Sequence, residues 1–281
     1  MSGKLLRYTH CARLCALALA TLALSSCKLD KLLFNTKSLS SYSLSKAVIP
    51  DSARVMVSLV SRGKTIYGFY VKSALGRQDR TILYCHGNRE SIEQYWDRVE
   101  LLYRAGYAIF IFDYEGFGMS EGECSEEALY ADGRAALNYV RSRPDVIPGN
   151  IIYYGYSLGC VVAIDLAAYE RAPKVLICEA PFASGEAIVQ SGALLDIPGS
   201  VALKGNFDNA SKIRLNHSPL LIFHGTDDRF VDMTKNAQVV FDNANQPKKF
   251  IQVPGAGHTT IPWTMGADEY LRNLEAFIAA Y

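Results

Sequence analysis

The sequence lacks a charge excess, and it lacks the motifs that bind nucleic acids, nucleotides or metal ions. Its 281 residues have a formal net charge of +1 and contain no basic cluster, so nothing in the charge favours a nucleic-acid partner. It has no Gly-rich phosphate loop and no Cys/His spacing for a metal. We therefore expect no metal site and no organic cofactor. The apolar fraction of 49% is ordinary for a globular protein with a substantial core.

Internal repeats and paired cysteine spacings are missing too. Cys85, Cys160 and Cys178 sit in or beside apolar runs, where a buried free thiol is the usual state. Cys124 lies in a polar stretch with no partner at a suggestive spacing. We therefore expect no disulfide framework.

The apolar run near the N-terminus is short for a membrane span. Residues 14–24 form a run of about 11 residues that follows three basic residues, which is typical of a signal peptide. The run ends in Leu-Ser-Ser-Cys27, which resembles the bacterial lipobox. We therefore predict a signal peptide over residues 1–26 and a lipid on Cys27 that anchors the protein to a membrane. A plain secretory signal or an uncleaved anchor is the alternative.

The residues after Cys27 bear on the location of the protein. Lys28, rather than Asp, follows the cysteine, which resembles outer-membrane lipoproteins of Gram-negative bacteria. The prediction is a lipid-anchored protein of the cell envelope, on the outer membrane if the source is Gram-negative. Residues 27–49, rich in Ser, Lys and Leu near their start, are expected to form a tether that docks onto a domain over residues 50–281.

Short apolar runs recur through that domain with helical patterns between them. A hairpin precedes the alternation, and most runs are continuously apolar, as strands covered on both faces are. The pattern predicts an α/β fold with an eight-stranded, mostly parallel sheet and helices on both faces. The expected strands are 55–60, 65–71, 81–85, 107–113, 151–154, 174–178, 220–223 and 249–253. The expected helices include 232–243 and 267–280, and residues 183–218, which have no strand pattern, are expected above the carboxyl edge of the sheet.

The pattern G-x-S-x-G, which surrounds the nucleophile in many serine hydrolases, occurs twice. The first copy, around Ser120, is separated from the preceding strand and is followed by a polar stretch. The second copy, around Ser157, has a strand directly before it and a helical pattern directly after it. A nucleophile elbow needs that strand–turn–helix context, so Ser157 is the candidate nucleophile and Ser120 a loop residue.

A serine alcohol needs a base, usually a histidine held by a carboxylate. Of five histidines, His258 alone follows the acid candidates and lies in a glycine-rich loop after a strand. The acid candidates are Asp227 and Asp228, which follow the strand over 220–223. The residues by themselves do not choose between the two.

Five stretches in order resemble the α/β-hydrolase superfamily over residues 50–281. They are His86-Gly-Asn88, the loop from Asp113 to Gly122, the pentapeptide around Ser157, His224-Gly-Thr-Asp-Asp-Arg-Phe-Val, and Gly-Ala-Gly-His258. The resemblance implies that the acid is Asp228 and that the backbone N–H groups of Leu158 and Asn88 form an oxyanion hole. It also implies a minimal cap over about 183–218. One departure is Arg89-Glu90, where relatives commonly have a small residue, and we expect it to narrow the site or to place a charge at its mouth.

The resemblance implies a serine hydrolase that cleaves small carboxylic esters or thioesters through an acyl-enzyme, with no cofactor. A peptidase or amidase is the alternative within enzymes. A catalytically silent lipoprotein that uses the fold as a binding module is the alternative outside them.

Overall fold

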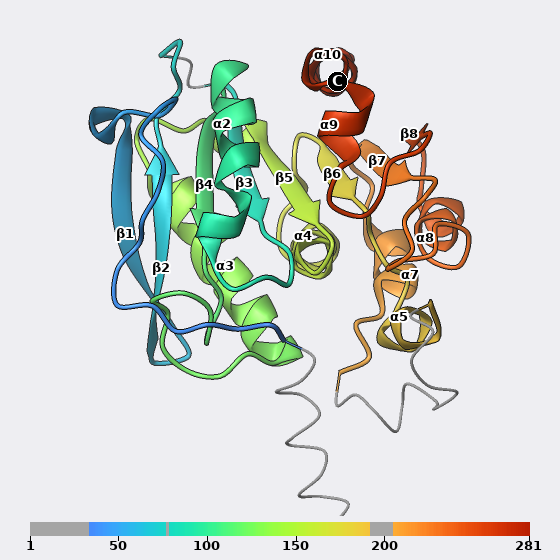
Figure 1. Cartoon of the computed structure of the whole chain (residues 1–281), viewed down its shortest axis with the longest axis horizontal. Coiled ribbons are helices and arrows are strands. Elements are labelled where there is room, and N and C mark those ends of the chain that lie inside the picture. Colours follow the sequence, from blue (N-terminus) through green and yellow to red (C-terminus); the bar gives the residue numbers. More distant parts are fainter. Residues whose placement is uncertain (1–33, 77–78, 192–204) are drawn as a thin grey trace, which may run out of the picture.

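Eight strands form one sheet in this computed structural model, which describes residues 34–76, 79–191 and 205–281 (Figure 1). The strand order is β1-β2-β4-β3-β5-β6-β7-β8. Strand β2 is antiparallel to β1 and β4, and the other neighbouring strands are parallel. The predicted eight-stranded, mostly parallel sheet is therefore confirmed. The strands are Arg54–Ser61 (β1), Lys64–Val71 (β2), Thr81–Cys85 (β3), Ala108–Phe112 (β4), Ile151–Tyr156 (β5), Leu176–Glu179 (β6), Leu220–Gly225 (β7) and Lys248–Val253 (β8).

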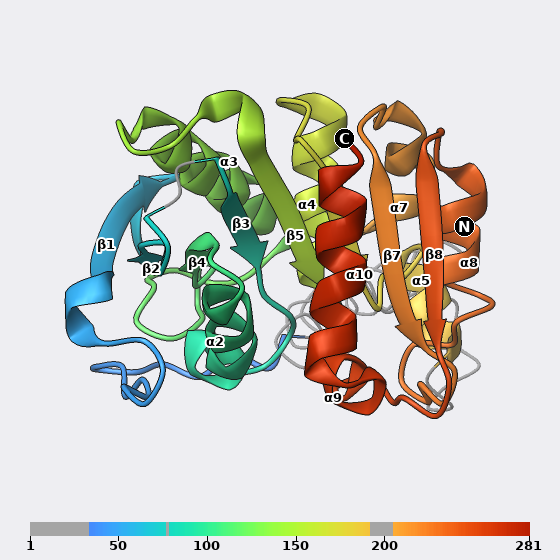
Figure 2. The same ribbon diagram turned by 90° about the horizontal axis from the view of Figure 1, so that it is seen from above.

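The central strands are continuously apolar because helices cover both faces of the sheet. Every residue of β3, β4, β5, β6 and β7 is buried, whereas β1, at one edge, is exposed or partly buried at every position except Ser61. Two buried clusters result, one on each face of the sheet. Helices α2 and α10 pack over one face, and α3, α4 and α8 cover the other (Figure 2). The described α-helices are Trp96–Arg104 (α2), Glu126–Ser142 (α3), Gly159–Tyr169 (α4), Gly185–Ser191 (α5), Asn209–Lys212 (α7), Ala237–Asn243 (α8), Ile261–Met265 (α9) and Ala267–Ala279 (α10).

Short 3-10 helices connect several of these elements. They are Asp51–Ala53 (η1), Ile92–Tyr95 (η2), Pro148–Asn150 (η3) and Ile213–Leu215 (η4). Serine side chains begin two of the helical segments: Ser91 accepts from the N–H of Glu93, and Ser125 accepts from the N–H of Ala128. Serine is favoured at helix N-caps because its hydroxyl can accept from a free N–H group of the first turn.

One predicted helix begins later than its pattern indicates. The apolar spacing predicts a helix from residue 232, but α8 starts at Ala237. The reason is Asn236, whose buried side chain accepts from the N–H of Ala183 and donates to the carbonyl of Asp232. This asparagine ties two loops together instead of continuing a helix, which a local pattern cannot reveal.

Several predictions concern residues outside the described ranges. The signal peptide and Cys27 lie there, as does the middle of the expected cap at 183–218. The described part of that segment contains α5, α7 and η4. Across the described ranges, no helix has both the length and the apolar character needed to cross a membrane.

Candidate active site

Ser157 lies in a strained turn between β5 and α4, as predicted for a nucleophile elbow. Its φ of +51° is in the left-handed region, which costs a residue with a side chain on the order of 1–3 kcal/mol. The N–H of Ser157 donates to the carbonyl of Glu179 at 2.9 Å, and the Ser157 carbonyl accepts from Cys160 at 2.9 Å. These two bonds hold the turn so that the hydroxyl lies at the carboxyl edge of the sheet.

The two flanking glycines are required by close packing around this turn. A Cβ on Gly155 would lie 2.6 Å from the Cα of Cys160, and one on Gly159 would lie 1.9 Å from the carbonyl oxygen of Cys85. Real side chains do not make contacts this short, so other residues at these positions would displace the backbone. The second contact also shows that the turn packs directly against the end of β3.

His258 lies between Ser157 and Asp228 at hydrogen-bonding distance from both. Its Nδ1 is 2.7 Å from Asp228 Oδ2, and its Nε2 is 2.9 Å from Ser157 Oγ. An ionised carboxylate can only accept, so Nδ1 carries the proton and Nε2 accepts the hydroxyl hydrogen of Ser157. This arrangement can remove a proton from the serine alcohol as it attacks a carbonyl.

Asp228, rather than Asp227, meets the histidine. The Oδ1 of Asp228 accepts from the N–H groups of Phe230 and Val231, at 2.9 and 2.8 Å. Asp227 instead accepts from the hydroxyl of its neighbour Thr226. The structure thus brings together the aspartate that the family resemblance implies, the histidine and the serine, each from a different loop at the carboxyl edge.

A second histidine supports the carboxylate of Asp228. His224 is fully buried at the end of β7, and its Nε2 is 3.3 Å from Asp228 Oδ2 and 2.9 Å from the carbonyl oxygen of Val231. Burial by itself raises the pKa of Asp228, but the hydrogen bonds from His224 and His258 outweigh it and hold the pKa well below its usual range. Asp228 is therefore ionised wherever the protein is folded at moderately acid or neutral pH.

Ser120 is occupied by the backbone around it. Its hydroxyl donates to the carbonyl of Asp113 at 2.9 Å and accepts from the N–H of Tyr67 at 2.9 Å. These contacts fix the loop after β4 to the neighbouring strand β2. No histidine among the described residues forms a hydrogen bond with this hydroxyl, which agrees with the prediction that Ser120 is a loop residue and not the nucleophile.

The two expected oxyanion donors lie on neighbouring loops. Leu158 directly precedes α4, and within the described chain no protein group accepts its N–H. Asn88 follows β3, the neighbour of β5 in the sheet. The Oδ1 of Asn88 accepts from the backbone N–H of Asn35 at 2.9 Å. The start of α4 favours negative charge near Leu158, because its free N–H groups and helix dipole are directed there.

A buried ion pair beside the site was not expected from the sequence. Arg98 of α2 donates to Glu179 Oε1 at 2.9 Å and to the carbonyl of Thr259 at 3.0 Å. The guanidinium also lies 4.4 Å from the ring centre of Tyr156, whose hydroxyl donates to the carbonyl of His258. Because the carbonyl of Glu179 accepts from Ser157, this pair connects the serine turn with the histidine loop. A lone arginine on a predicted helix gives no local signal of such a role.

The carboxylate of Glu179 has further partners within the core. The hydroxyls of Tyr154 and Tyr270 both donate to its Oε2. Burial raises the pKa of both tyrosines well above the usual value, so both remain protonated donors. Of the residues that the structure describes, none form a group of three or more His, Cys, Asp or Glu able to hold a metal ion.

Comparison with known proteins identifies relatives for most of the chain. The family model described as "Serine aminopeptidase, S33" matches residues 76–203. An alpha/beta hydrolase domain-containing protein 17B of Homo sapiens is 32% identical over 231 residues, which cover 82% of this chain and 76% of that protein. An uncharacterized protein of Mycobacterium tuberculosis is 32% identical over 214 residues, covering 75% of this chain and 74% of that protein.

Solved structures share the fold at lower sequence identity. An esterase of Pyrococcus furiosus superimposes with a TM-score of 0.72 at 17% identity, covering 88% of this chain and 97% of that one. An alpha-beta hydrolase of Vibrio vulnificus superimposes with a TM-score of 0.67 at 23% identity, covering 81% and 82% of the two chains. The predicted α/β-hydrolase fold is confirmed.

Proposed function

The chain belongs to the α/β-hydrolase family and is a hydrolase, and from that premise we propose that it cleaves acyl esters or thioesters through Ser157. The observation that carries the proposal is the hydrogen-bonded series from Ser157 Oγ to His258 Nε2 at 2.9 Å and from His258 Nδ1 to Asp228 Oδ2 at 2.7 Å. A serine alcohol acquires its reactivity from such a base and orienting acid.

The reaction proceeds in two halves. Ser157 Oγ attacks the acyl carbonyl while His258 Nε2 takes its proton, and Asp228 stabilises the imidazolium that forms. The imidazolium then gives the proton to the leaving alcohol or thiol, and an acyl group remains on Ser157. In the second half, His258 activates water, which releases the carboxylic acid and restores the serine. No metal or organic cofactor enters either half.

The developing oxyanion is held by the N–H groups of Leu158 and Asn88. A donor of this kind contributes on the order of 10²–10³ in rate. Support for Leu158 comes from its position at the N-terminal end of α4, and support for Asn88 from its place on the adjoining loop after β3. Both positions are at the edge of the sheet on which Ser157 lies.

An ester or thioester is favoured over a peptide as the substrate class. The matching family is described as a serine aminopeptidase, and a structural relative is called an esterase. The two carboxylates that contact the serine turn or His258 are already paired: Glu179 with Arg98, and Asp228 with two histidines. A peptidase therefore stays the second candidate.

A lipid anchor on Cys27 gives the protein access to acyl substrates in a membrane. Asn35, which contacts Asn88, lies eight positions after Cys27. Eight residues span at most about 28 Å when fully extended. The anchor therefore holds the proposed oxyanion loop within roughly that distance of the lipid head groups, which suits the cell envelope as the location.

Fluorophosphonate labelling tests the proposal directly. The intact protein should label, Ser157→Ala should not, and Ser120→Ala should still label. Labelling that survives Ser157→Ala contradicts the assignment of the nucleophile. A folded protein that never labels supports the non-catalytic binding lipoprotein instead.

A matched substrate series then identifies the bond that is cleaved. An ester, a thioester and an amide with the same acyl group, each at several chain lengths, should give turnover of the first two and little of the third. Faster cleavage of the amide supports the peptidase. Incorporation of labelled palmitate, lost in Cys27→Ala, tests the anchor separately.

A further inference from the structure

A segment ahead of the sheet, residues 35–45, crosses the loops that follow β3 and β4; we call it the N-terminal strap. Its Thr36 pairs with Glu90 and its Ser38 pairs with Gly118, each as an isolated parallel bridge. Leu39 also donates its N–H to the carbonyl of Gly118 at 2.8 Å. The strap therefore runs beside the loop that carries Asn88 and the loop that carries Gly118.

The first half of the strap holds both ends of the tripeptide from Asn88 to Glu90. The N–H of Asn35 donates to Asn88 Oδ1 at 2.9 Å, and the N–H of Glu90 donates to the carbonyl of Asn35 at 2.7 Å. Lys37 Nζ lies 3.3 Å from Glu90 Oε2. The φ of Glu90 is +40°, a strained value that these contacts maintain. Arg89-Glu90, the departure from the family pattern, thus provides contacts for the strap.

The second half of the strap acts on the same loop through a buried aspartate. Tyr42 donates its hydroxyl hydrogen to Asp113 Oδ2 at 2.7 Å and accepts from the N–H of Met119. The other oxygen of Asp113 accepts from the N–H of Ile92 at 2.9 Å and lies 3.1 Å from His86 Nε2. Asp113 and His86 are completely buried. Tyr42 therefore supports residues on both sides of Asn88.

The hydroxyl of Tyr42 is a permanent donor. Burial raises its pKa well above the usual value, and the charge of Asp113 raises it further. Without this hydroxyl, Asp113 Oδ2 would be left in the core one hydrogen bond short, which is unfavourable for a buried carboxylate. The loop that carries Asp113 would then be free to shift until its carboxylate reaches another donor.

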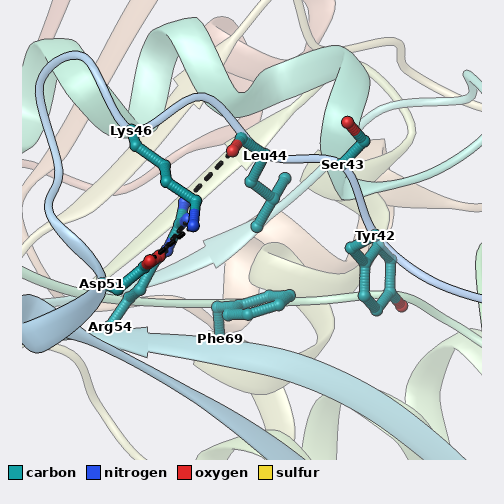
Figure 3. Close-up of a pocket in the computed structure, with 7 residues that line it drawn as sticks. All are labelled: Tyr42, Ser43, Leu44, Lys46, Asp51, Arg54 and Phe69. Carbon is teal, nitrogen blue, oxygen red and sulfur yellow. Dashed lines mark hydrogen bonds and ion pairs between the residues drawn. The ribbon is translucent and has the colours of Figure 1, made fainter.

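The far end of the strap is fixed by separate contacts. Arg54 donates to the carbonyl of Ser45 at 2.9 Å. Arg54 also pairs with Asp51, which in turn pairs with Lys46 (Figure 3). A hollow of about 440 Å³ lies between this end and Phe69. Lys46 directly follows the strap and is exposed, and its printed ion pair is with Asp51 rather than with the loop after β3, so it offers a control position next to the strap.

We propose that the N-terminal strap positions the oxyanion loop, with Asn35 and Tyr42 as positioning residues for the N–H of Asn88. The inference rests on the proposed function, because an oxyanion donor matters only if Ser157 forms a tetrahedral intermediate. Such donors act through their placement, which must be held to a fraction of an ångström in the transition state. The chain ahead of the domain is thereby part of the catalytic unit as well as a connection to the membrane.

The test uses the full chain and compares Tyr42→Phe and Asn35→Pro with the control Lys46→Met. Proline removes the N–H that Asn88 accepts but keeps the carbonyl that Glu90 needs. The measurements are the rate of fluorophosphonate labelling and the hydrolysis of p-nitrophenyl butyrate, with kcat calculated per serine that labels. Counting labelled serines corrects for any fraction that fails to fold.

We expect kcat to fall about 10-fold or more in Tyr42→Phe and Asn35→Pro. The fall should approach about 100-fold in a variant whose Asn88 N–H no longer reaches the oxyanion. KM should change less than about twofold, because the contact forms only in the transition state. Lys46→Met should match wild type in both measurements. Asn88→Ala removes the same bond from the other side, so the double variant Asn35→Pro/Asn88→Ala should be no slower than the slower single variant.

The outcomes separate this inference from the proposed function. A wild-type protein that labels at Ser157, with Tyr42→Phe and Asn35→Pro labelling and turning over at the wild-type rate, overturns the role of the strap alone. Losses that add in the double variant also overturn it, because they show that the two residues act independently. A folded wild type that does not label overturns the proposed function, and the strap inference with it.

Discussion

The buried pair of Arg98 and Glu179 gives the most direct test of how the site is held together. The exposed fractions of the two side chains are 6% and 0%, and their charged atoms are 2.9 Å apart. Burial alone lowers the pKa of Arg98, but the Glu179 carboxylate holds it well above its usual value. The perturbation is Arg98→Met, which keeps much of the aliphatic stem and removes the charge.

The expected cost follows from what remains after the substitution. The Glu179 carboxylate stays in the core with hydrogen bonds from Tyr154 and Tyr270 but with no opposite charge. Removing one partner of a buried ion pair costs about 3–5 kcal/mol. The carbonyl of Thr259 loses its donor as well, which loosens the loop that carries His258. We therefore expect a loss of about 3–5 kcal/mol in the free energy of unfolding.

Urea unfolding of the variant measures this loss. The double variant Arg98→Met/Glu179→Gln removes both charges and should recover much of the stability, since a neutral replacement of a buried pair is often close to neutral in energy. A loss below about 1 kcal/mol in Arg98→Met, the range of exposed pairs, would refute the reasoning. So would a double variant that is less stable than the single one.

Three further predictions concern other parts of the chain. Asp228→Asn should lower kcat by about 10⁴, because the imidazole loses its orienting acceptor, whereas Asp227→Asn should stay within about twofold of wild type in the same esterase assay, as expected for a group outside the transition state. Burial raises the pKa of Asp132 from 3.8 to about 6, so the native state binds more protons than the unfolded state between these values and stability falls as pH rises through them. Asp132→Asn removes the group that titrates, so the unfolding midpoint of the variant relative to wild type should be higher at pH 8 than at pH 4. An equal difference at both pH values contradicts the shifted pKa. Gly159→Ala should abolish soluble folded protein because its Cβ would lie 1.9 Å from a carbonyl oxygen, while Gly149→Ala, with no atom within 4 Å of its Cβ, should leave the melting temperature unchanged or slightly higher.

Much of the fold could be predicted because its signals are local. Continuous apolar runs identify strands that are covered on both faces, and their alternation with helical spacing indicates a parallel sheet. The turn at Ser157 is predictable for the same reason. A strand, two glycines and a helix in immediate succession describe one strained turn, and no distant residue is needed to recognise it.

The choice between neighbouring residues required distances across the sheet. Asp227 and Asp228 have the same side chain and are adjacent in sequence, so the residues alone leave both open, and only the resemblance favours Asp228. The geometry decides between them because the loop after β8 brings His258 within 2.7 Å of Asp228 Oδ2. Likewise, the late start of α8 depends on Asn236, whose partner is more than fifty residues away.

The sequence by itself determined the order of strands and helices, the strained serine turn and the histidine that follows every acid candidate. Each element and the serine turn depend on a few consecutive residues, and the place of His258 after the acid candidates depends only on the order of the chain. The tertiary structure alone decided that Arg98 and Glu179 join the serine turn to the histidine loop, and that Asn35 and Tyr42 reach the loop of Asn88. These contacts join residues separated by 53 to 161 positions. No periodicity or motif records them, because each depends on which strands the fold places side by side.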